Sequence, residues 1–406
     1  MKILHTSDWH LGRSLYGEKR YDEFEQFLHW LTETIEAEQI DVLLVAGDIF
    51  DSGTPSNRAQ KLYYQFLTTV AASACRHIVI TAGNHDSPSF LNAPKELLEA
   101  INVHLVASIS DNVEDEVVTL DDDDGKPALI VCAVPYLRDR DIRTAEAGES
   151  SDDKHTKLIA GIKNHYKKVF EVAQRRQKEM VVPVVAMGHL FTTDSKRVEG
   201  DGVRDLYVGT LAYIGSDTFP DFVDYTALGH LHVPQKVGNS DTIRYCGSPI
   251  PIGFGEAKQK KMVITVDFSE TIQVAEVDVP QFQRLEQIKG SIEEIESRLV
   301  QLKDENSNAW LEVEYTGDDV VASLRSQIES AVDGTLLKVL RIKNRQLSDV
   351  VMGRVDSAET LDNISVDAVF ERVLDAKSVP NEQRTELQNS YKEIVQLLAE
   401  EDRNAE

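Results

Sequence analysis

Five short apolar segments of this chain each lead directly into side chains that can bind a metal ion. The first segment, residues 2–6, runs into Asp8 and His10. The other four each stop at a glycine, where the backbone can be approached closely, and then present an Asp, an Asn or a His. They are residues 41–46 before Asp48, residues 77–82 before Asn84, residues 181–187 before His189, and residues 225–228 before His230 and His232. Sites in α/β proteins lie on loops at the carboxyl ends of strands, so the pattern predicts an α/β fold whose loop tips converge on one metal site.

Asp8 and His10 are two residues apart at the end of the first predicted strand. Side chains alternate along a strand with a period of two, so both are expected to point to the same side. An oxygen ligand and an imidazole together make half of a transition-metal site. Each motif is weak alone, because an Asp after a strand often caps the next helix. The prediction rests on the occurrence of five such motifs, all at strand ends.

The motifs Asp-x-His, Gly-Asp, Gly-Asn-His-Asp, Gly-His and Gly-His-x-His, in this order, resemble those of the calcineurin-like dimetal phosphoesterases. The residues around them are most similar to the SbcD branch of that superfamily, the nuclease subunits that act with a coiled-coil ATPase. The segments that carry this likeness are residues 5–12, 46–51, 82–87 and 245–249. The resemblance is dense to about residue 267 and looser beyond it. It implies a four-layer αββα sandwich, whereas the periodicity of the sequence alone indicates only a mixed α/β protein.

The resemblance also implies a ligand set for two divalent cations. Asp8, His10, Asp48 and His232 would hold the first, and Asp48, Asn84, His189 and His230 the second, with Asp48 bridging. Such a pair clamps an in-line phosphoryl displacement. Mixed imidazole and oxygen ligands suit Mn²⁺ better than Mg²⁺, and the family implies Mn²⁺ as well.

His85 and Asp86 lie beside these ligands without being assigned as ligands. We expect His85 to act as the general acid at the leaving sugar oxygen, with a role in orienting a ligand as the alternative. Asp86 is expected to orient His85. Some relatives carry a histidine three residues after the bridging aspartate, whereas this chain has Asp51, and an extra carboxylate there is expected to tune the site.

Composition limits where such a protein works and how it binds its substrate. The three cysteines are far apart, no apolar run is long enough to cross a membrane, and no leader-like segment opens the sequence, so we expect a cytoplasmic protein. The resemblance implies that its activity is associated with the nucleoid. The net charge of −26 is unfavourable for binding DNA phosphates. The positive charge must then come from the metals, from a local basic patch or from a partner. Arg13, Lys19 and Arg20, in the loop after the first motif, are the candidate DNA contacts, and the alternative is that they are solvated charges of a surface loop.

Changes of pattern along the chain predict three regions. Residues 1–279 form the phosphoesterase domain, and residues 280–344 form a small α+β domain that corresponds to a capping domain in the family. Residues 345–406 contain two amphipathic helical stretches in a predicted hairpin. Two such helices cannot bury both apolar stripes against each other alone. They dock either on the rest of this chain or, as the resemblance implies, on the coiled coil of an SbcC-like ATPase.

The resulting hypothesis is a Mn²⁺-dependent DNA nuclease. It would act as a 3′–5′ exonuclease on duplex ends and as an endonuclease on single strands or hairpins, in DNA end processing, recombination and repair. A homodimer is expected from the family, and no membrane association is expected. The chain has no G-x-x-x-x-G-K-[ST] motif, so the sequence gives no support for ATP binding by this chain. Two alternatives stay open, a small-molecule phosphodiesterase of the same superfamily and a scaffold that metal ions only stabilise.

Overall fold

The computed structural model of the chain describes residues 1–143, 149–193, 195, 213–317 and 324–344, together with residues 370, 374, 384 and 391. The chain divides into two compact units, which are described separately below. Residues 1–286 with 308–310 form the first unit, and residues 287–307 with 311–406 form the second. Within the described part of the chain, none of the helices combines the length and the hydrophobicity that a membrane crossing requires.

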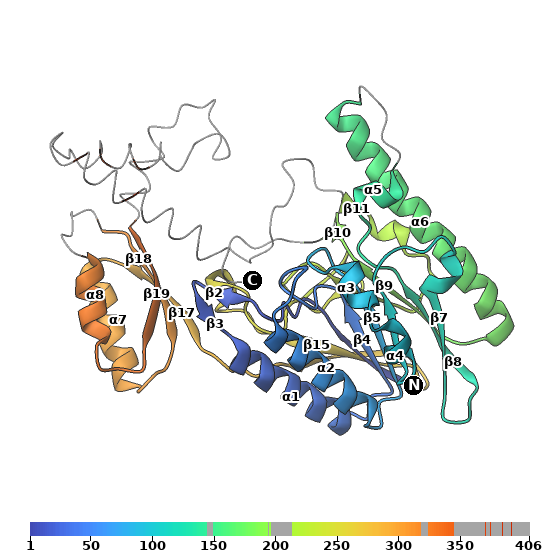
Figure 1. Cartoon of the computed structure of the whole chain (residues 1–406), viewed down its shortest axis with the longest axis horizontal. Helices are drawn as coiled ribbons and strands as arrows, with labels where there is room; N and C mark the ends of the chain where they lie inside the picture. Colours follow the sequence, from blue (N-terminus) through green and yellow to red (C-terminus); the bar gives the residue numbers. More distant parts are fainter. Residues whose placement is uncertain are drawn as a thin grey trace. The chain divides into compact units, whose positions relative to one another are not determined.

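A six-stranded sheet forms one half of the first unit (Figure 1). The strand order is β16-β15-β1-β4-β5-β6, with β1, β4, β5 and β6 parallel and with β15 and β16 antiparallel. Its strands are β1 (Lys2–Thr6), β4 (Val42–Ala46), β5 (His77–Thr81), β6 (Val103–Val106), β15 (Met262–Asp267) and β16 (Gln273–Asp278). The connecting helices α1 (Tyr21–Ala37) and α2 (Asn57–Ala71) pack on the outer face of this sheet, with the short helices α3 (Pro88–Asn92) and α4 (Lys95–Glu99) nearby.

A second six-stranded sheet forms the other half of the unit, in the order β13-β14-β12-β9-β8-β7. Its strands are β7 (Val117–Asp121), β8 (Pro127–Ala133), β9 (Val184–His189), β12 (Tyr225–Gly229), β13 (Gln235–Lys236) and β14 (Ile243–Tyr245). The helix α6 (Ser151–Met180), preceded by α5 (Asp139–Ile142), covers its outer face. The acidic run at residues 121–124 ends β7 and leads into the β7–β8 turn. Short pairs complete the unit, β2 (Ser14–Leu15) with β3 (Glu18–Lys19) and β10 (Phe191–Thr192) with β11 (Tyr213–Ile214).

The two sheets pack face to face, which confirms the predicted four-layer sandwich. Along β4, Val42 and Leu44 belong to the core between the sheets, whereas Leu43 and Val45 face α1 and α2. All four side chains are fully buried. A strand that is buried on both faces needs apolar residues at every position, which explains the continuous apolar runs of the sequence.

The parallel strands bring the predicted ligand loops to the same edges of the sheets. β1, β4 and β5 are parallel neighbours, so the loops that follow them leave the first sheet at one edge. In the second sheet, β9 and β12 are also parallel neighbours, with Gly229 paired to His189. Because the sheets stack, loops from both meet above the core.

The second unit contains a three-stranded sheet in the order β17-β18-β19 and two helices. The elements are β17 (Leu285–Gly290), α7 (Ile292–Asp304), β18 (Trp310–Tyr315), α8 (Leu324–Val332) and β19 (Lys338–Asn344). Ser291 and Glu294 form a capping box at the start of α7. The predicted hairpin of residues 345–406 lies outside the described residues, except for four positions. Two of these, Phe370 and Tyr391, stack with ring centroids 4.0 Å apart.

Candidate metal centre

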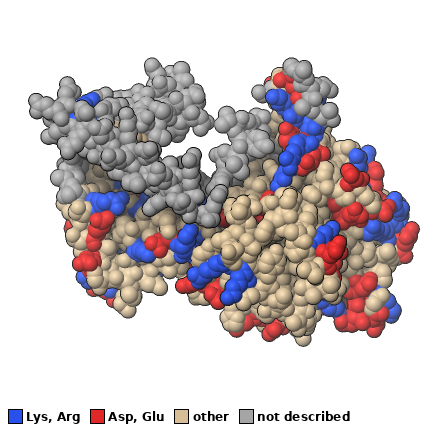
Figure 2. Space-filling model, viewed as in Figure 1, with Lys and Arg blue, Asp and Glu red and all other residues tan. Residues whose placement is uncertain are grey.

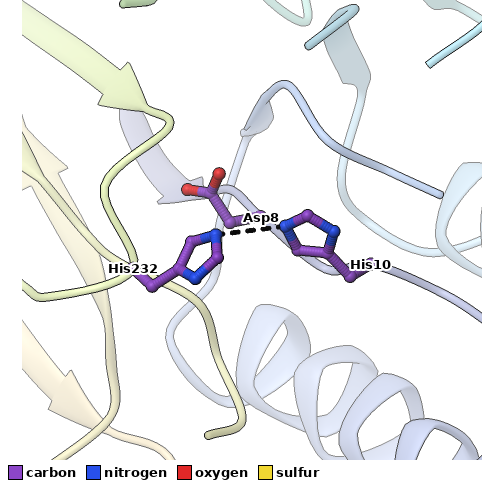
Figure 3. Close-up of side chains that lie close together, drawn as sticks. All are labelled: Asp8, His10 and His232. Carbon is purple, nitrogen blue, oxygen red and sulfur yellow. Dashed lines mark hydrogen bonds between the residues drawn. The ribbon is translucent and has the colours of Figure 1, made fainter. Parts of the chain in front are cut away.

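Asp8, His10 and His232 form a first group of potential metal ligands (Figure 3). One ligand atom from each of the three lies within 4.8 Å of the others, and all three side chains are buried. The Nε2 atoms of His10 and His232 face each other at 3.2 Å. Asp8 and His10 come from the loop after β1, and His232 comes from the loop after β12.

The backbone that brings Asp8 and His10 together is not the one that we predicted. Strand β1 ends at Thr6, and both residues have left-handed conformations, with φ of 53° and 49°. Alternation along a strand is therefore not the reason why they converge. Hydrogen bonds from Asp8 N to Gly47 O and from His10 N to Asp48 O, each 3.0 Å, hold this loop against the one after β4. Asp48 and His230 also have positive φ, and non-glycine residues in this region are uncommon and cluster at functional sites.

Asp48, His189 and His230 form a second group, whose ligand atoms also lie within 4.8 Å of one another. The Nδ1 atom of His230 is 3.2 Å from Nε2 of His189, which is itself 3.0 Å from Oδ1 of Asn84. Oδ2 of Asp48 lies 3.3 Å from His189 Nε2 and 3.6 Å from His10 Nε2. Asp48 thus stands between the two groups, and the structure brings all seven predicted ligands together.

Glycines are required where the ligand loops cross. A Cβ atom at Gly83 would lie 2.1 Å from Oδ1 of Asp48, and one at Gly47 would lie 2.2 Å from Nδ1 of His189. Neither space can hold a methyl group. Gly47 also has a φ of +86°, which side chains rarely adopt. The glycines at the strand ends therefore let the loops pack directly against the ligands.

Charge at the centre is concentrated on Asp48. Burial alone would raise the pKa of the Asp48 carboxyl, but His189 and His10 hold this pKa well below its ordinary value. Burial likewise opposes the charge on His189, yet Asp48 raises the pKa of that imidazole to about 9. Burial lowers the pKa of His10, and burial together with His189 lowers the pKa of His230. His10 and His230 are therefore held neutral, which is the form of an imidazole that binds a metal, whereas His189 would lose a proton when a cation binds beside the ionised Asp48.

The donor set fits divalent transition-metal ions. Ligand atoms around such an ion lie about 2.0–2.2 Å from it, so neighbouring ligand atoms are roughly 3 Å apart. The contacts between His10 and His232 and between His189 and His230 are both 3.2 Å. The other ring nitrogen of His189, Nδ1, donates to the carbonyl of Ala46 at 2.9 Å, which leaves Nε2 free to bind a metal.

His85 lies at the edge of the centre and is half-buried. Its ring is 4.7 Å from that of His10 between centroids. Its backbone N donates to Oδ1 of Asp48 at 2.9 Å, and its Nδ1 donates to the carbonyl of Asp51 at 2.9 Å. The Nε2 atom therefore carries the lone pair in the neutral ring. It is Asp51, through its backbone, that orients His85.

Asp86 does not have the position that we predicted for it. Its carboxylate accepts backbone hydrogen bonds from Gly83, Ile49 and Phe50, at 2.9, 3.2 and 3.0 Å. It therefore ties the loop after β5 to the loop after β4 and does not orient the His85 ring. Burial, and then the neighbouring Asp48, raise the pKa of Asp86 to about 6 against these hydrogen bonds.

The three candidate DNA contacts differ in exposure. Lys19 is exposed. Arg20 is 2% exposed and forms a two-pronged ion pair with Glu23, and it also donates to the carbonyl of Pro251. The prediction is wrong for Arg20, because this side chain anchors the start of α1 and is not available to phosphate. Arg13 is 18% exposed and donates to Oδ1 of Asp51 at 2.9 Å.

Sequence reasoning missed Glu256 and Lys261, which lie behind His232. Oε1 of Glu256 is 3.4 Å from Nδ1 of His232, and Glu256 is paired with Lys261. Lys261 also donates to the backbone carbonyl of His232 at 3.0 Å. Burial alone would raise the pKa of the Glu256 carboxyl, but Lys261 and His232 lower this pKa to about 2. Nothing in the spacing of these residues signals the contact, since it arises from the packing of the loop after β14.

Comparison with known protein families agrees with this architecture. The family model of the calcineurin-like phosphoesterases matches residues 1–234. The model described as the Type 5 capsule protein repressor C-terminal domain matches residues 281–378.

Three curated relatives share a single name, that of the SbcD subunit of the nuclease SbcCD. The protein of Escherichia coli K12 is 36% identical over 406 residues, which cover 99% of each chain. That of Rhodobacter capsulatus is 34% identical over 66% of this chain and 67% of its own. That of Bacillus subtilis is 31% identical over 77% of this chain and 78% of its own. The chain therefore belongs to the SbcD family of SbcCD nuclease subunits, and its amino-terminal part is a calcineurin-like phosphoesterase domain.

Proposed function

We propose that this protein is a metal-dependent DNA nuclease that hydrolyses phosphodiester bonds. The observation that carries the proposal is the pair of buried ligand groups that meet at Asp48. Divalent cations at these ligands would supply the positive charge that polarises a scissile phosphate and that lowers the pKa of a water molecule.

In the proposed ligand assignment, Asp8, His10, Asp48 and His232 would hold one cation. Asp48, Asn84, His189 and His230 would hold the other. Asp48 is assigned to both because its Oδ2 atom lies within 3.6 Å of histidine nitrogens from both groups. The set contains four imidazoles, a donor that Mn²⁺ accepts more readily than Mg²⁺, so Mn²⁺ is the proposed ion.

We assign His85 the role of general acid. Its Nδ1–H is committed to the carbonyl of Asp51, so the proton for the leaving group must come from Nε2 of the imidazolium form, which becomes the neutral imidazole. The side chain is half-buried at the edge of the ligand groups, where a leaving sugar oxygen can reach it. A proton delivered there stabilises the departing alkoxide, which is a poor leaving group on its own. Asp86 supports this step indirectly, because it holds the loop that carries His85.

The substrates and partners of the family extend to this chain as proposals. DNA is the substrate, processed from duplex ends in the 3′–5′ direction and cut internally in single strands or hairpins. An SbcC-like coiled-coil ATPase is the partner, bound through residues 345–406, and the chain forms a homodimer. Residues 1–279 act as the nuclease domain, and residues 280–344 act as the capping domain. The protein works in the cytoplasm, at the nucleoid.

Replacement of His85 by Gln separates acid catalysis from metal binding. The loss of a general acid typically slows a reaction by about 10²–10⁴-fold when the leaving group is poor. We expect a loss of this size on hairpin DNA, with Mn²⁺ binding unchanged. Bis-p-nitrophenyl phosphate has a good leaving group that needs no proton, so its hydrolysis should change little.

The two substrates also test the proposal as a whole. Equal losses on both substrates would remove the acid role from His85. Failure of the wild-type chain, purified with its ATPase partner and Mn²⁺, to cut any DNA substrate would refute the nuclease function itself.

A further inference from the structure

Both histidines of the first ligand group are backed by a carboxylate on the side away from the ligand atoms. His10 presents Nε2 to the centre, and its Nδ1 atom lies 3.4 Å from Oδ1 of Asp51. His232 also presents Nε2, and its Nδ1 atom lies 3.4 Å from Oε1 of Glu256. His10 Nδ1 and Glu256 Oε1 are buried, and neither has a hydrogen bond of ordinary length and angle. A small movement of either imidazole would therefore bring its Nδ1 atom into hydrogen-bonding range of the carboxylate that faces it.

Each of these carboxylates is held in place by a cation. Arg13 donates to Oδ1 of Asp51 at 2.9 Å, and Lys261 is paired with Glu256. Glu256 is further fixed by hydrogen bonds from Ser248 Oγ and Ile252 N, at 3.2 and 3.1 Å. The pairing keeps both carboxylates ionised and acceptor-only, so the histidine nitrogen that faces them must carry the proton.

The second ligand group has different support. Nδ1 of His189 donates to a neutral acceptor, the carbonyl of Ala46, at 2.9 Å. The ring of His230 packs against Phe191 and Tyr136, with centroids 4.1 and 6.2 Å away. A carboxylate behind an imidazole raises the basicity of its metal-binding nitrogen more than a neutral carbonyl does, because it stabilises the partial positive charge that the ring gains when it binds a cation.

From this asymmetry we infer that Asp51 and Glu256 are positioning residues that make the two cation positions unequal, so that the position formed by Asp8, His10 and His232 holds its ion more tightly. The inference rests on the proposed two-cation site. It gives Asp51 two functions, because its side chain supports His10 while its backbone carbonyl orients His85. It also makes Arg13 part of the metal centre's support and not a free phosphate contact.

Mn²⁺ binding to the full-length chain tests the inference without any measurement of cleavage. Electron paramagnetic resonance of unbound Mn²⁺ in a titration should resolve two classes of site in the wild type. Loss of a partner behind a metal-bound histidine typically weakens affinity by about 10–100-fold. Asp51→Asn and Glu256→Gln should each weaken the tighter class by that factor and leave the weaker class unchanged. Asp51→Asn keeps the backbone bond to His85, so cleavage should recover at saturating Mn²⁺.

Asp22→Asn is the matched control, since it makes the same chemical change at a carboxylate that is 87% exposed and paired with Arg58. It should leave both classes unaltered. Asp8→Asn should remove the tighter class, and Asn84→Ala should reduce the weaker one. If Glu256→Gln fails to fold, Asp51→Asn carries the test, because its carboxylate is partly exposed.

Equal affinities in the wild type, equal weakening of both classes by the variants, or the reverse assignment by Asp8→Asn would each overturn the inference. A different result would refute the proposed function. A chain with two unequal Mn²⁺ sites that cuts no DNA would refute the nuclease proposal and leave this inference intact.

Discussion

Replacement of Gly83 by Ala is the smallest change that should disrupt the metal centre. The added Cβ would lie 2.1 Å from Oδ1 and 2.3 Å from N of Asp48. Comfortable contacts between such atoms are about 3.5 Å, so the loop that carries Asp48 must move by roughly 1 Å or more. A displacement of that size at a catalytic group costs about 10²-fold in rate. Overpacking should also lower the free energy of unfolding by about 1–3 kcal/mol.

Mn²⁺-dependent cleavage of a linear duplex, measured beside urea denaturation, checks both numbers. Gly53→Ala is the matched control in a neighbouring loop, because its Cβ would meet Ser87 Cβ at an ordinary 3.5 Å. We expect Gly53→Ala to retain wild-type stability and cleavage. Wild-type cleavage and Mn²⁺ affinity in a folded Gly83→Ala variant would show that the loop tips need not pack this closely, and would refute the steric reasoning.

Two further predictions concern buried polar groups. Asp86→Asn should lower the free energy of unfolding by about 2–3 kcal/mol in urea titrations. The reason is that the amide cannot accept all three backbone hydrogen bonds that reach this carboxylate. Unchanged stability would contradict the role of Asp86 in joining the two loops. Burial lowers the pKa of His5 to about 3 from 6.5, so the unfolded chain takes up a proton below pH 6.5 that the folded chain does not. Between pH 7 and pH 5 this group alone should reduce stability by about 2 kcal/mol. A metal-free His5→Gln variant should lose that part of the pH dependence, and an identical pH profile for both proteins would rule His5 out as its source.

Much of the fold was predictable because its local signals agree with the tertiary structure. The apolar runs before Asp48, Asn84 and His189 are strands buried on both faces, and such strands need no alternation that might blur the pattern. The glycines that end the runs mark the places where one loop tip touches another. The joint occurrence of these signals predicted which side chains meet. It did not predict how the chain turns to bring them together, since Asp8 and His10 depend on left-handed backbone that the sequence pattern does not reveal.

The supporting residues were harder to predict because most of their contacts depend on segments that are distant in sequence. Arg20 looked like an exposed base in a polar loop, but besides its local ion pair with Glu23 it donates to the carbonyl of Pro251, and it is buried. Glu256 follows no ligand motif and reaches His232 only through the tertiary packing of its loop. Asp86 adjoins His85 in sequence, yet its side chain points to the backbone of the neighbouring loop. Contacts of this kind are fixed by tertiary structure, so local patterns carry no trace of them.

The net charge of −26 is compatible with a DNA substrate once its distribution is considered. Figure 2 shows acidic and basic side chains interspersed on the face drawn, with no continuous acidic surface over the described residues. At the centre, Arg13 and Lys261 neutralise the outer carboxylates, Asp51 and Glu256. The other buried carboxylates at the centre are Asp8, Asp48 and Asp86. Two divalent cations would bring four positive charges against these three, so the loaded centre would attract a phosphate although the chain carries a net negative charge. On this reasoning, attraction of a phosphate substrate is a property of the metal-bound form, and removal of the cations should weaken DNA binding as well as abolish cleavage.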